Sequence, residues 1–215
     1  AVERRGGAVA VTGRGGELTA CGEAIFLGNS GTSMRLLTAV AALARGKTIL
    51  TGGARMQARP IQHLLDGLTQ LGVAARSTAG SGCPPVEVIG GAVNGGRTRL
   101  NCSVSSQFLS ALLLIAPCTR QGIEIAVTQG PVSRPYVDIT LDSLTRFGVE
   151  SERRGDEWFH VAGGQRYRAG VYAVEPDCSQ ASYFWAAAAV TGSTVTVKGN
   201  SADSRQGDIR LLDLL

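Results

Sequence analysis

The sequence predicts an α/β protein built from repeated units, each running strand, helix, strand, helix and then short strands. Two periodic signals indicate the repeat. A glycine directly before a β-branched strand recurs at Gly46, Gly122 and Gly192, a period too long for the common short solenoids. Helix-opening sequences recur in step with these glycines, at Arg59-Pro60, Arg134-Pro135 and Gly207-Asp208.

The first unit follows a strand expected over 8–12 and begins with a short apolar strand over 24–27. Thr32 or Ser33 is expected to cap a helix over 32–44, because their hydroxyls can satisfy free backbone N–H groups. A β-branched run predicts the next strand over 47–51. Pro60 is expected at the first position of a second helix, whose leucines follow helical spacing. Short strands are expected over 73–76, 86–89 and 97–102.

The pattern then returns twice. In the second copy we expect a helix from Ser105 to Pro117, a strand over 123–127 and a helix opened by Ser133, followed by strands near 149–153, 158–161 and 170–174. The third copy is expected to hold a helix over 177–190, a strand over 194–198 and a terminal helix from Gly207.

The first helix of each copy is almost free of charge, and residues 110–116 and 186–190 carry none. Such a helix is typically buried on most sides, whereas the second helix carries charge on one face and should cover the outside. We therefore expect the units to pack around shared inner helices. Their positive N-terminal ends would then converge on one cleft, which favours an anionic ligand.

Polar residues gather at these same helix starts. Hydroxyls, amides and arginine at converging helix ends suit a phosphate on a hydroxylated small molecule. Three alternatives stay open: each serine serves only as a cap, Arg59 is simply solvated, and Tyr136 only packs. The candidate residues are Asn29, Thr32, Ser33, Arg59, Ser105, Ser106, Gln107, Ser133, Arg134, Tyr136, Asp177, Ser179 and Gln180.

Composition argues against several other classes. No apolar run is long enough to span a bilayer, and a net charge of +4 without basic runs among aromatics does not favour nucleic acid. The five cysteines and two histidines are scattered, which argues against a disulfide framework and a metal site. No pair of carboxylates stands out as a general acid and base.

Five segments, in this order, resemble the 5-enolpyruvylshikimate-3-phosphate (EPSP) synthase family, the 3-phosphoshikimate 1-carboxyvinyltransferases. They are Leu27–Arg35, Arg59–Ile61, Ser103–Ala111, Ser133–Thr140 and Gln206–Asp208. The resemblance implies an enolpyruvyl transferase-like fold: two domains, each an inside-out α/β barrel of three βαβαββ units around a pseudo-threefold axis. Here that fold would be incomplete.

The family transfers the enolpyruvyl group of phosphoenolpyruvate to the 5-hydroxyl of shikimate 3-phosphate, a step toward chorismate and aromatic amino acids. The resemblance implies a cytoplasmic, monomeric parent enzyme with no metal or organic cofactor. By the same resemblance, shikimate 3-phosphate would be held by Thr32, Ser105, Ser106, Gln107, Ser133 and Tyr136. Phosphoenolpyruvate would be held by Asn29, Gly31, Arg59 and Gln107.

We expect residues 1–205 to form the first domain without its opening segment, and 206–215 to form the hinge and the start of a second domain, the chain's main partner. Because catalysis needs groups from both sides of the cleft, these residues alone should bind substrate without turnover. A small-anion binding module that never had a catalytic half is the alternative.

Overall fold

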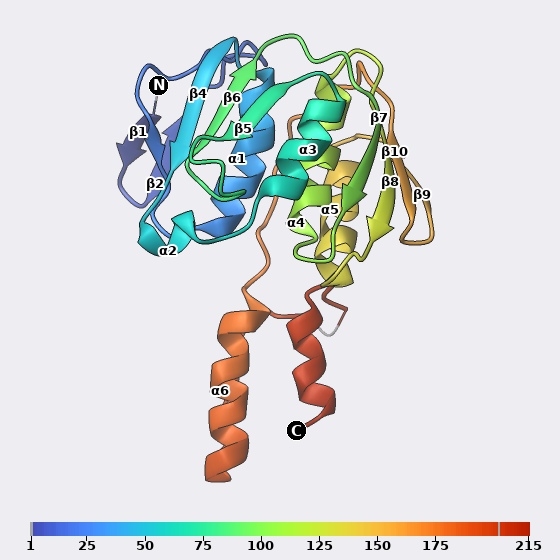
Figure 1. The fold of residues 1–215 in the computed structure, drawn as a ribbon. Helices are drawn as coiled ribbons and strands as arrows, with labels where there is room; N and C mark the ends of the chain where they lie inside the picture. Colours follow the sequence, from blue (N-terminus) through green and yellow to red (C-terminus); the bar gives the residue numbers. More distant parts are fainter. Residues whose placement is uncertain (1, 202) are drawn as a thin grey trace.

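The computed structural model describes residues 2–201 and 203–215. Most of them form a body in which helices lie between two β-sheets, and a smaller helical unit lies below this body (Figure 1). Positions 1 and 202, which belong to the predicted first domain, lie outside the described residues. No helix in the described part of the chain is long and apolar enough to cross a membrane.

Both large sheets have four strands and the same topology. The order is β3-β4-β6-β5 in one and β7-β8-β10-β9 in the other, with the first pair parallel and the others antiparallel. The first sheet contains β3 (Ile25–Phe26), β4 (Gly46–Thr51), β5 (Ala74–Ser77) and β6 (Val86–Gly90). The second contains β7 (Gly96–Asn101), β8 (Ile123–Gln129), β9 (Glu152–Arg154) and β10 (Trp158–Val161). The matching orders confirm the predicted repeat for two βαβαββ units.

A parallel pair needs a crossover, and a helix supplies it in each unit. The helix α1 (Gly31–Leu43) joins β3 to β4, and α4 (Gln107–Ile115), extended by the 3₁₀ turn η1 (Ala116–Cys118), joins β7 to β8. The second helices are α3 (Gln62–Gln70) and α5 (Arg134–Arg146). Because the strands before these helices run parallel within each unit, the helices begin at the carboxyl edge of the sheets.

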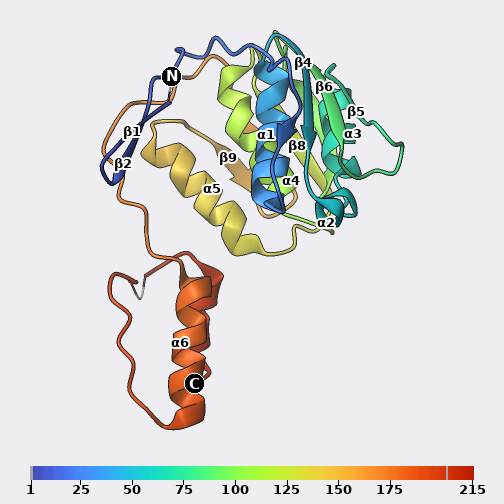
Figure 2. The same cartoon turned by 90° about the vertical axis from the view of Figure 1, so that its left-hand side faces the viewer.

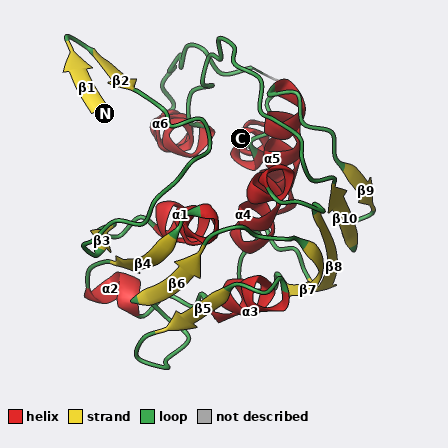
Figure 3. Ribbon diagram, turned by 90° about the horizontal axis from the view of Figure 1, so that it is seen from above, coloured by secondary structure: helices red, strands yellow, loops and turns green. Residues whose placement is uncertain are grey.

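The inner helices α1 and α4 lie side by side (Figures 2 and 3). Residues 108–113 of α4 are all buried, which confirms the prediction from their lack of charge. The outer helix α3 buries Leu64, Leu65 and Leu68 while Asp66 stays exposed, as its one-sided charge predicts. One continuous core, which includes Leu100, Phe108 and Leu112 of the second unit, joins the two units.

Two helix starts differ from the predicted ones. Ser30, not Thr32 or Ser33, caps α1, and its Oγ accepts a hydrogen bond from the Ser33 N–H at 3.3 Å. Pro60 lies outside α3, because the next residue, Ile61, is held in a non-helical conformation by its N–H bond to the Gly82 carbonyl at 2.9 Å. A short helix that the sequence did not predict, α2 (Ala54–Gln57), fills the preceding turn.

The N-terminal strand predicted over 8–12 forms as β2 (Ala8–Val11), and its hairpin partner β1 (Val2–Arg5) was not predicted. The two strands form a sheet of their own, and all their residues are exposed. This hairpin therefore adds no strand to either of the large sheets.

The third copy departs from the prediction. Its helix α6 (Cys178–Thr191) packs against the 3₁₀ helix η2 (Gly207–Asp213) and buries only Cys178, Ala181 and Trp185. The prediction that this helix is buried on most sides is wrong, since Phe184 and Val190 are exposed. The predicted strands over 170–174 and 194–198 are also wrong, because no described strand lies beside them to pair with their backbones.

The join between α1 and its sheet yields a stability prediction. A Cβ at Gly90 would lie 2.1 Å from the carbonyl oxygen of Ala41 and 2.4 Å from that of Ala44. These are backbone atoms, so Gly90→Ala should lower the free energy of unfolding by about 1–3 kcal/mol or more. Urea unfolding measures the change. Gly91→Ala is the control, because a Cβ there meets no atom within 4 Å. Equal stability of the two variants would contradict the prediction.

Candidate functional site

A buried arginine joins the first turns of α1 and α4. Arg35 is only 8% exposed, and its Nη1 donates to Ser105 Oγ at 3.0 Å and to Gln107 Oε1 at 2.8 Å. Its Nη2 is 3.5 Å from the Pro60 carbonyl oxygen, and its guanidinium carbon lies 5.1 Å from the centre of the Phe108 ring. One side chain thus ties together two inner helices and the turn before α3.

The same turns share a second connection. Gln107 Nε2 donates to Thr32 Oγ1 at 2.9 Å, and the Gln107 N–H donates to Ser105 Oγ at 3.2 Å. We call Thr32, Arg35, Ser105 and Gln107 the helix-start cluster. Three of these four residues were predicted from the sequence, and the structure brings them together across more than 70 residues of chain.

The start of α1 faces a second arginine. A Cβ at Gly31 would lie 2.4 Å from Arg59 Nη1 and 2.8 Å from Arg59 Cζ, so only glycine lets this guanidinium approach the helix start. Asn29 and Arg59 line one pocket of ≈ 430 Å³ together with Arg55 and Ala58. The structure therefore groups Asn29, Gly31 and Arg59 at the start of α1.

The electrostatics of this region suit an anion. Burial lowers the pKa of Arg35, and the nearby positive charge of Arg59 lowers this pKa further. Among the described residues, no carboxylate forms an ion pair with either guanidinium. Two arginines and the positive end of α1 therefore meet where a phosphate or carboxylate would offset their charge.

The remaining predicted residues are divided among four helix starts. Ser33 lies in the first turn of α1, Ser106 precedes α4, and Ser133, Arg134 and Tyr136 lie at the start of α5. Asp177, Ser179 and Gln180 lie at the start of α6, outside the main body, so the structure does not bring them to the cluster (Figure 1). Ser106 is 3% exposed, whereas Ser133 and Tyr136 are exposed, and Ser133 has a left-handed backbone with φ of 53°. In residues 2–201 and 203–215, no hydrogen bond joins the side chains of Ser133 and Tyr136 to the helix-start cluster. They lie on the neighbouring helix, since α5 packs against α4.

One hydrogen bond fixes how α4 and α5 are aligned. Ser110 Oγ and Thr140 Oγ1 are 2.7 Å apart. Ser106 and Tyr136 each lie four residues earlier, one helical turn nearer the helix start. The alignment therefore places both at the same end of this helix pair.

The sequence reasoning missed Arg35 as a site residue. The available signal was a charge inside a helix that otherwise reads as apolar, since Arg35 is the only charged residue of α1. A charge in such a helix is rarely buried without partners. Those partners lie about 70 residues away in sequence, and no local pattern points to them.

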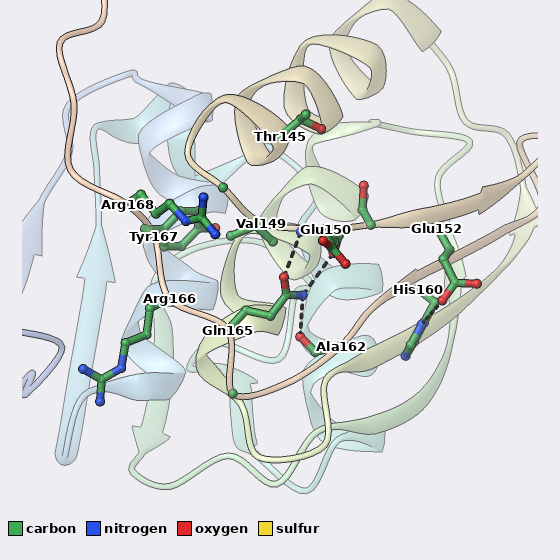
Figure 4. A pocket seen from close by; sticks show the side chains of 13 residues that line it. Thr145, Val149, Glu150, Glu152, His160, Ala162, Gln165, Arg166, Tyr167 and Arg168 are labelled. Carbon is green, nitrogen blue, oxygen red and sulfur yellow. Dashed lines mark hydrogen bonds and ion pairs between the residues drawn. The ribbon is translucent and has the colours of Figure 1, made fainter.

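A larger pocket of ≈ 1160 Å³ lies elsewhere, between the end of α5, β9 and the loop over 162–168 (Figure 4). Several of its polar groups already pair with one another. Gln165 bonds to the main chain of Glu150 and to the Ala162 carbonyl, and His160 Nδ1 lies 3.1 Å from Glu152. None of the predicted site residues lines it. In the described part of the chain, no group of His, Cys, Asp or Glu is arranged to hold a metal ion.

The structure thus defines a repeat protein of two βαβαββ units, with an anion-suited group of side chains at its helix starts. The profile of the EPSP synthase (3-phosphoshikimate 1-carboxyvinyltransferase) family matches residues 1–215. The chain belongs to this family.

Sequence relatives agree with this result. The 3-phosphoshikimate 1-carboxyvinyltransferase of Citrobacter koseri is 47% identical over 207 residues, which are 95% of this chain and 48% of that protein. The chloroplastic enzyme of Petunia hybrida is 45% identical over 197 residues, 89% of this chain and 38% of that protein. The chain thus spans about half the length, or less, of these relatives.

A solved structure agrees as well. The EPSP synthase of Acinetobacter baumannii matches with a TM-score of 0.73 and 30% identity, over 88% of this chain and 42% of that one. The predicted fold class is thereby confirmed.

The approach of Arg59 to Gly31 yields a second prediction. In Gly31→Ala the new methyl group should displace the flexible Arg59 guanidinium and leave the fold intact. Binding of inorganic phosphate, followed by NMR titration of the α1 amides, should weaken about tenfold through loss of a charged hydrogen bond. Gly22→Ala is the control, since a Cβ there contacts nothing. Unchanged phosphate affinity in Gly31→Ala would contradict this prediction.

Proposed function

We propose that this chain is the substrate-binding part of an EPSP synthase. The whole protein would transfer the enolpyruvyl group of phosphoenolpyruvate to the 5-hydroxyl of shikimate 3-phosphate, releasing phosphate. The observation that carries the proposal is the helix-start cluster beside Arg59. There the donors and cations that the family motifs supply stand together at the carboxyl edge of two sheets.

The roles divide between two anionic ligands. Arg59, Asn29, Gln107 and the N–H groups at Gly31 would hold phosphoenolpyruvate, whose phosphate and carboxylate both suit a guanidinium. The hydroxyls and amides of Thr32, Ser105, Ser106 and Gln107, with Ser133 and Tyr136 on α5, would hold the phosphate and hydroxyl groups of shikimate 3-phosphate.

The reaction proceeds by addition and then elimination. The 5-hydroxyl oxygen loses its proton and bonds to C2 of phosphoenolpyruvate while C3 gains a proton, which gives a tetrahedral ketal. Loss of a proton from C3 and of phosphate from C2 then forms the product. We assign these proton transfers to none of the described residues. Asp138 and Asp142, the carboxylates of α5, form ion pairs with arginines on the outer side of that helix.

The extent of the first domain is a separate proposal. The sequence predicts a first domain over 1–205 and the start of a second over 206–215. The packing of η2 on α6, with a hydrophobic cluster of their own, favours a boundary before Cys178 instead.

Under either boundary we propose binding without turnover by the 215 residues alone, since groups from the other side of the cleft are required. A cytoplasmic location also stays a prediction.

Calorimetric titration with shikimate 3-phosphate tests the binding role. We expect binding that requires the 3-phosphate, with shikimate as the control ligand. Ser105→Ala/Ser106→Ala should weaken it at least about tenfold through loss of two hydroxyl contacts. Ser151→Ala, a serine outside the cluster, should bind like the wild type.

The outcomes separate the alternatives. Equal affinity for shikimate and shikimate 3-phosphate would contradict the proposed substrate. Phosphate-dependent binding, together with no turnover by the full-length protein that contains this chain, would favour the small-anion binding module instead.

A further inference from the structure

We propose that Arg35 is a positioning residue that fixes the orientation of the Gln107 side-chain amide and holds the Arg59-Pro60 turn against the inner helices. This inference rests on the proposed function, because it assigns how the substrate site is held in shape. Arg35 is a buried member of the helix-start cluster, at 8% exposure.

The orientation of the amide follows from donor chemistry. A guanidinium only donates, so the atom of Gln107 that faces Arg35 must be the acceptor Oε1, at 2.8 Å. The amide nitrogen Nε2 is thereby turned toward Thr32 and the start of α1, where it lies 2.9 Å from Thr32 Oγ1. Arg35 thus ensures that the cleft receives N–H donors at this position, which suits phosphate and hydroxyl oxygens.

The same guanidinium acts on three elements at once. Its Nη1 also donates to Ser105 Oγ on the approach to α4, and its Nη2 reaches the Pro60 carbonyl, next to Arg59. Lysine cannot reproduce this, because a single ammonium lacks the planar fork that serves several acceptors. The geometry therefore links the two predicted subsites through one buried side chain.

We do not expect the burial of Arg35 to add stability. A buried charge often contributes less than a packed apolar side chain of similar length. Met in this position would still cover the Phe108 ring, on which the guanidinium now lies. We therefore expect Arg35→Met to fold with a melting temperature at least as high as that of Gly31→Ala, and its defect to appear in binding.

The test uses the 215-residue chain and calorimetry with shikimate 3-phosphate. Arg35→Met should weaken binding about 10- to 100-fold, and Arg35→Lys should fall between Arg35→Met and the wild type. Arg99→Met is the matched control, because Arg99 is an exposed arginine on β7 whose side chain lies outside the cluster. Wild-type affinity in Arg35→Met would overturn the inference and leave the proposed function standing.

A double-mutant cycle separates positioning from general loosening. If Arg35 acts through Gln107, Arg35→Met should lose most of its effect in a Gln107→Ala background. Residues in contact typically show such coupling, whereas independent effects add. Additive losses of affinity would overturn the inference.

A ligand-free measurement covers the case in which the wild-type chain does not bind shikimate 3-phosphate. The side-chain NH₂ signals of Gln107, assigned by their loss in Gln107→Ala, report the mobility of the amide by NMR relaxation. They should be rigid in the wild type and flexible in Arg35→Met, with Arg99→Met unchanged. A mobile amide in the wild type would overturn the positioning role, whereas a rigid amide without binding would count against the proposed function alone.

Discussion

The packing of α1 against α4 is the contact on which the rest of the structure depends. Each helix is the crossover of a parallel strand pair, so its place is set by its own sheet. Pressing the two apolar helices together fixes one sheet relative to the other and joins both units in one core. It also places Thr32 beside Gln107, because both lie in the first turn of their helix. The helix-start cluster is therefore a consequence of the core.

Arg35 is the exception within that apolar contact. A charge between two inner helices is costly unless hydrogen bonds compensate for the water that it loses. Here Ser105, Gln107 and Pro60 supply the acceptors, and the Phe108 ring covers one face of the guanidinium. Such an arrangement specifies the relative position of three elements more narrowly than apolar packing does, since hydrogen bonds are directional. The buried Arg35 is therefore better explained by the precise placement of the site residues than by a gain in stability.

The strand and helix pattern of both complete units could be predicted from sequence because periodicity and glycine position are local signals. Residues 170–174 and 194–198 have the same β-branched character, yet no strand forms there. A strand exists only where another strand accepts its hydrogen bonds, and sequence pattern does not show the neighbour. The same limit applies to α6, whose lack of charge indicated burial although Phe184 and Val190 are exposed. Composition describes what a helix can bury and leaves open which element covers it.

The candidate site shows a related division. The hydroxyl and amide residues were predictable because they mark helix starts, and Arg59 because it precedes one. Arg35 and the Gly31–Arg59 approach depend on contacts over long stretches of sequence, and only the fold reveals them. The two features have opposite steric effects. Gly31 leaves room for the Arg59 guanidinium, whereas the Arg35 side chain fills a buried position between helices. The first turn of α1 therefore tolerates little change. An atom added at Gly31 displaces the Arg59 guanidinium, and loss of the Arg35 donors releases the side-chain amide of Gln107.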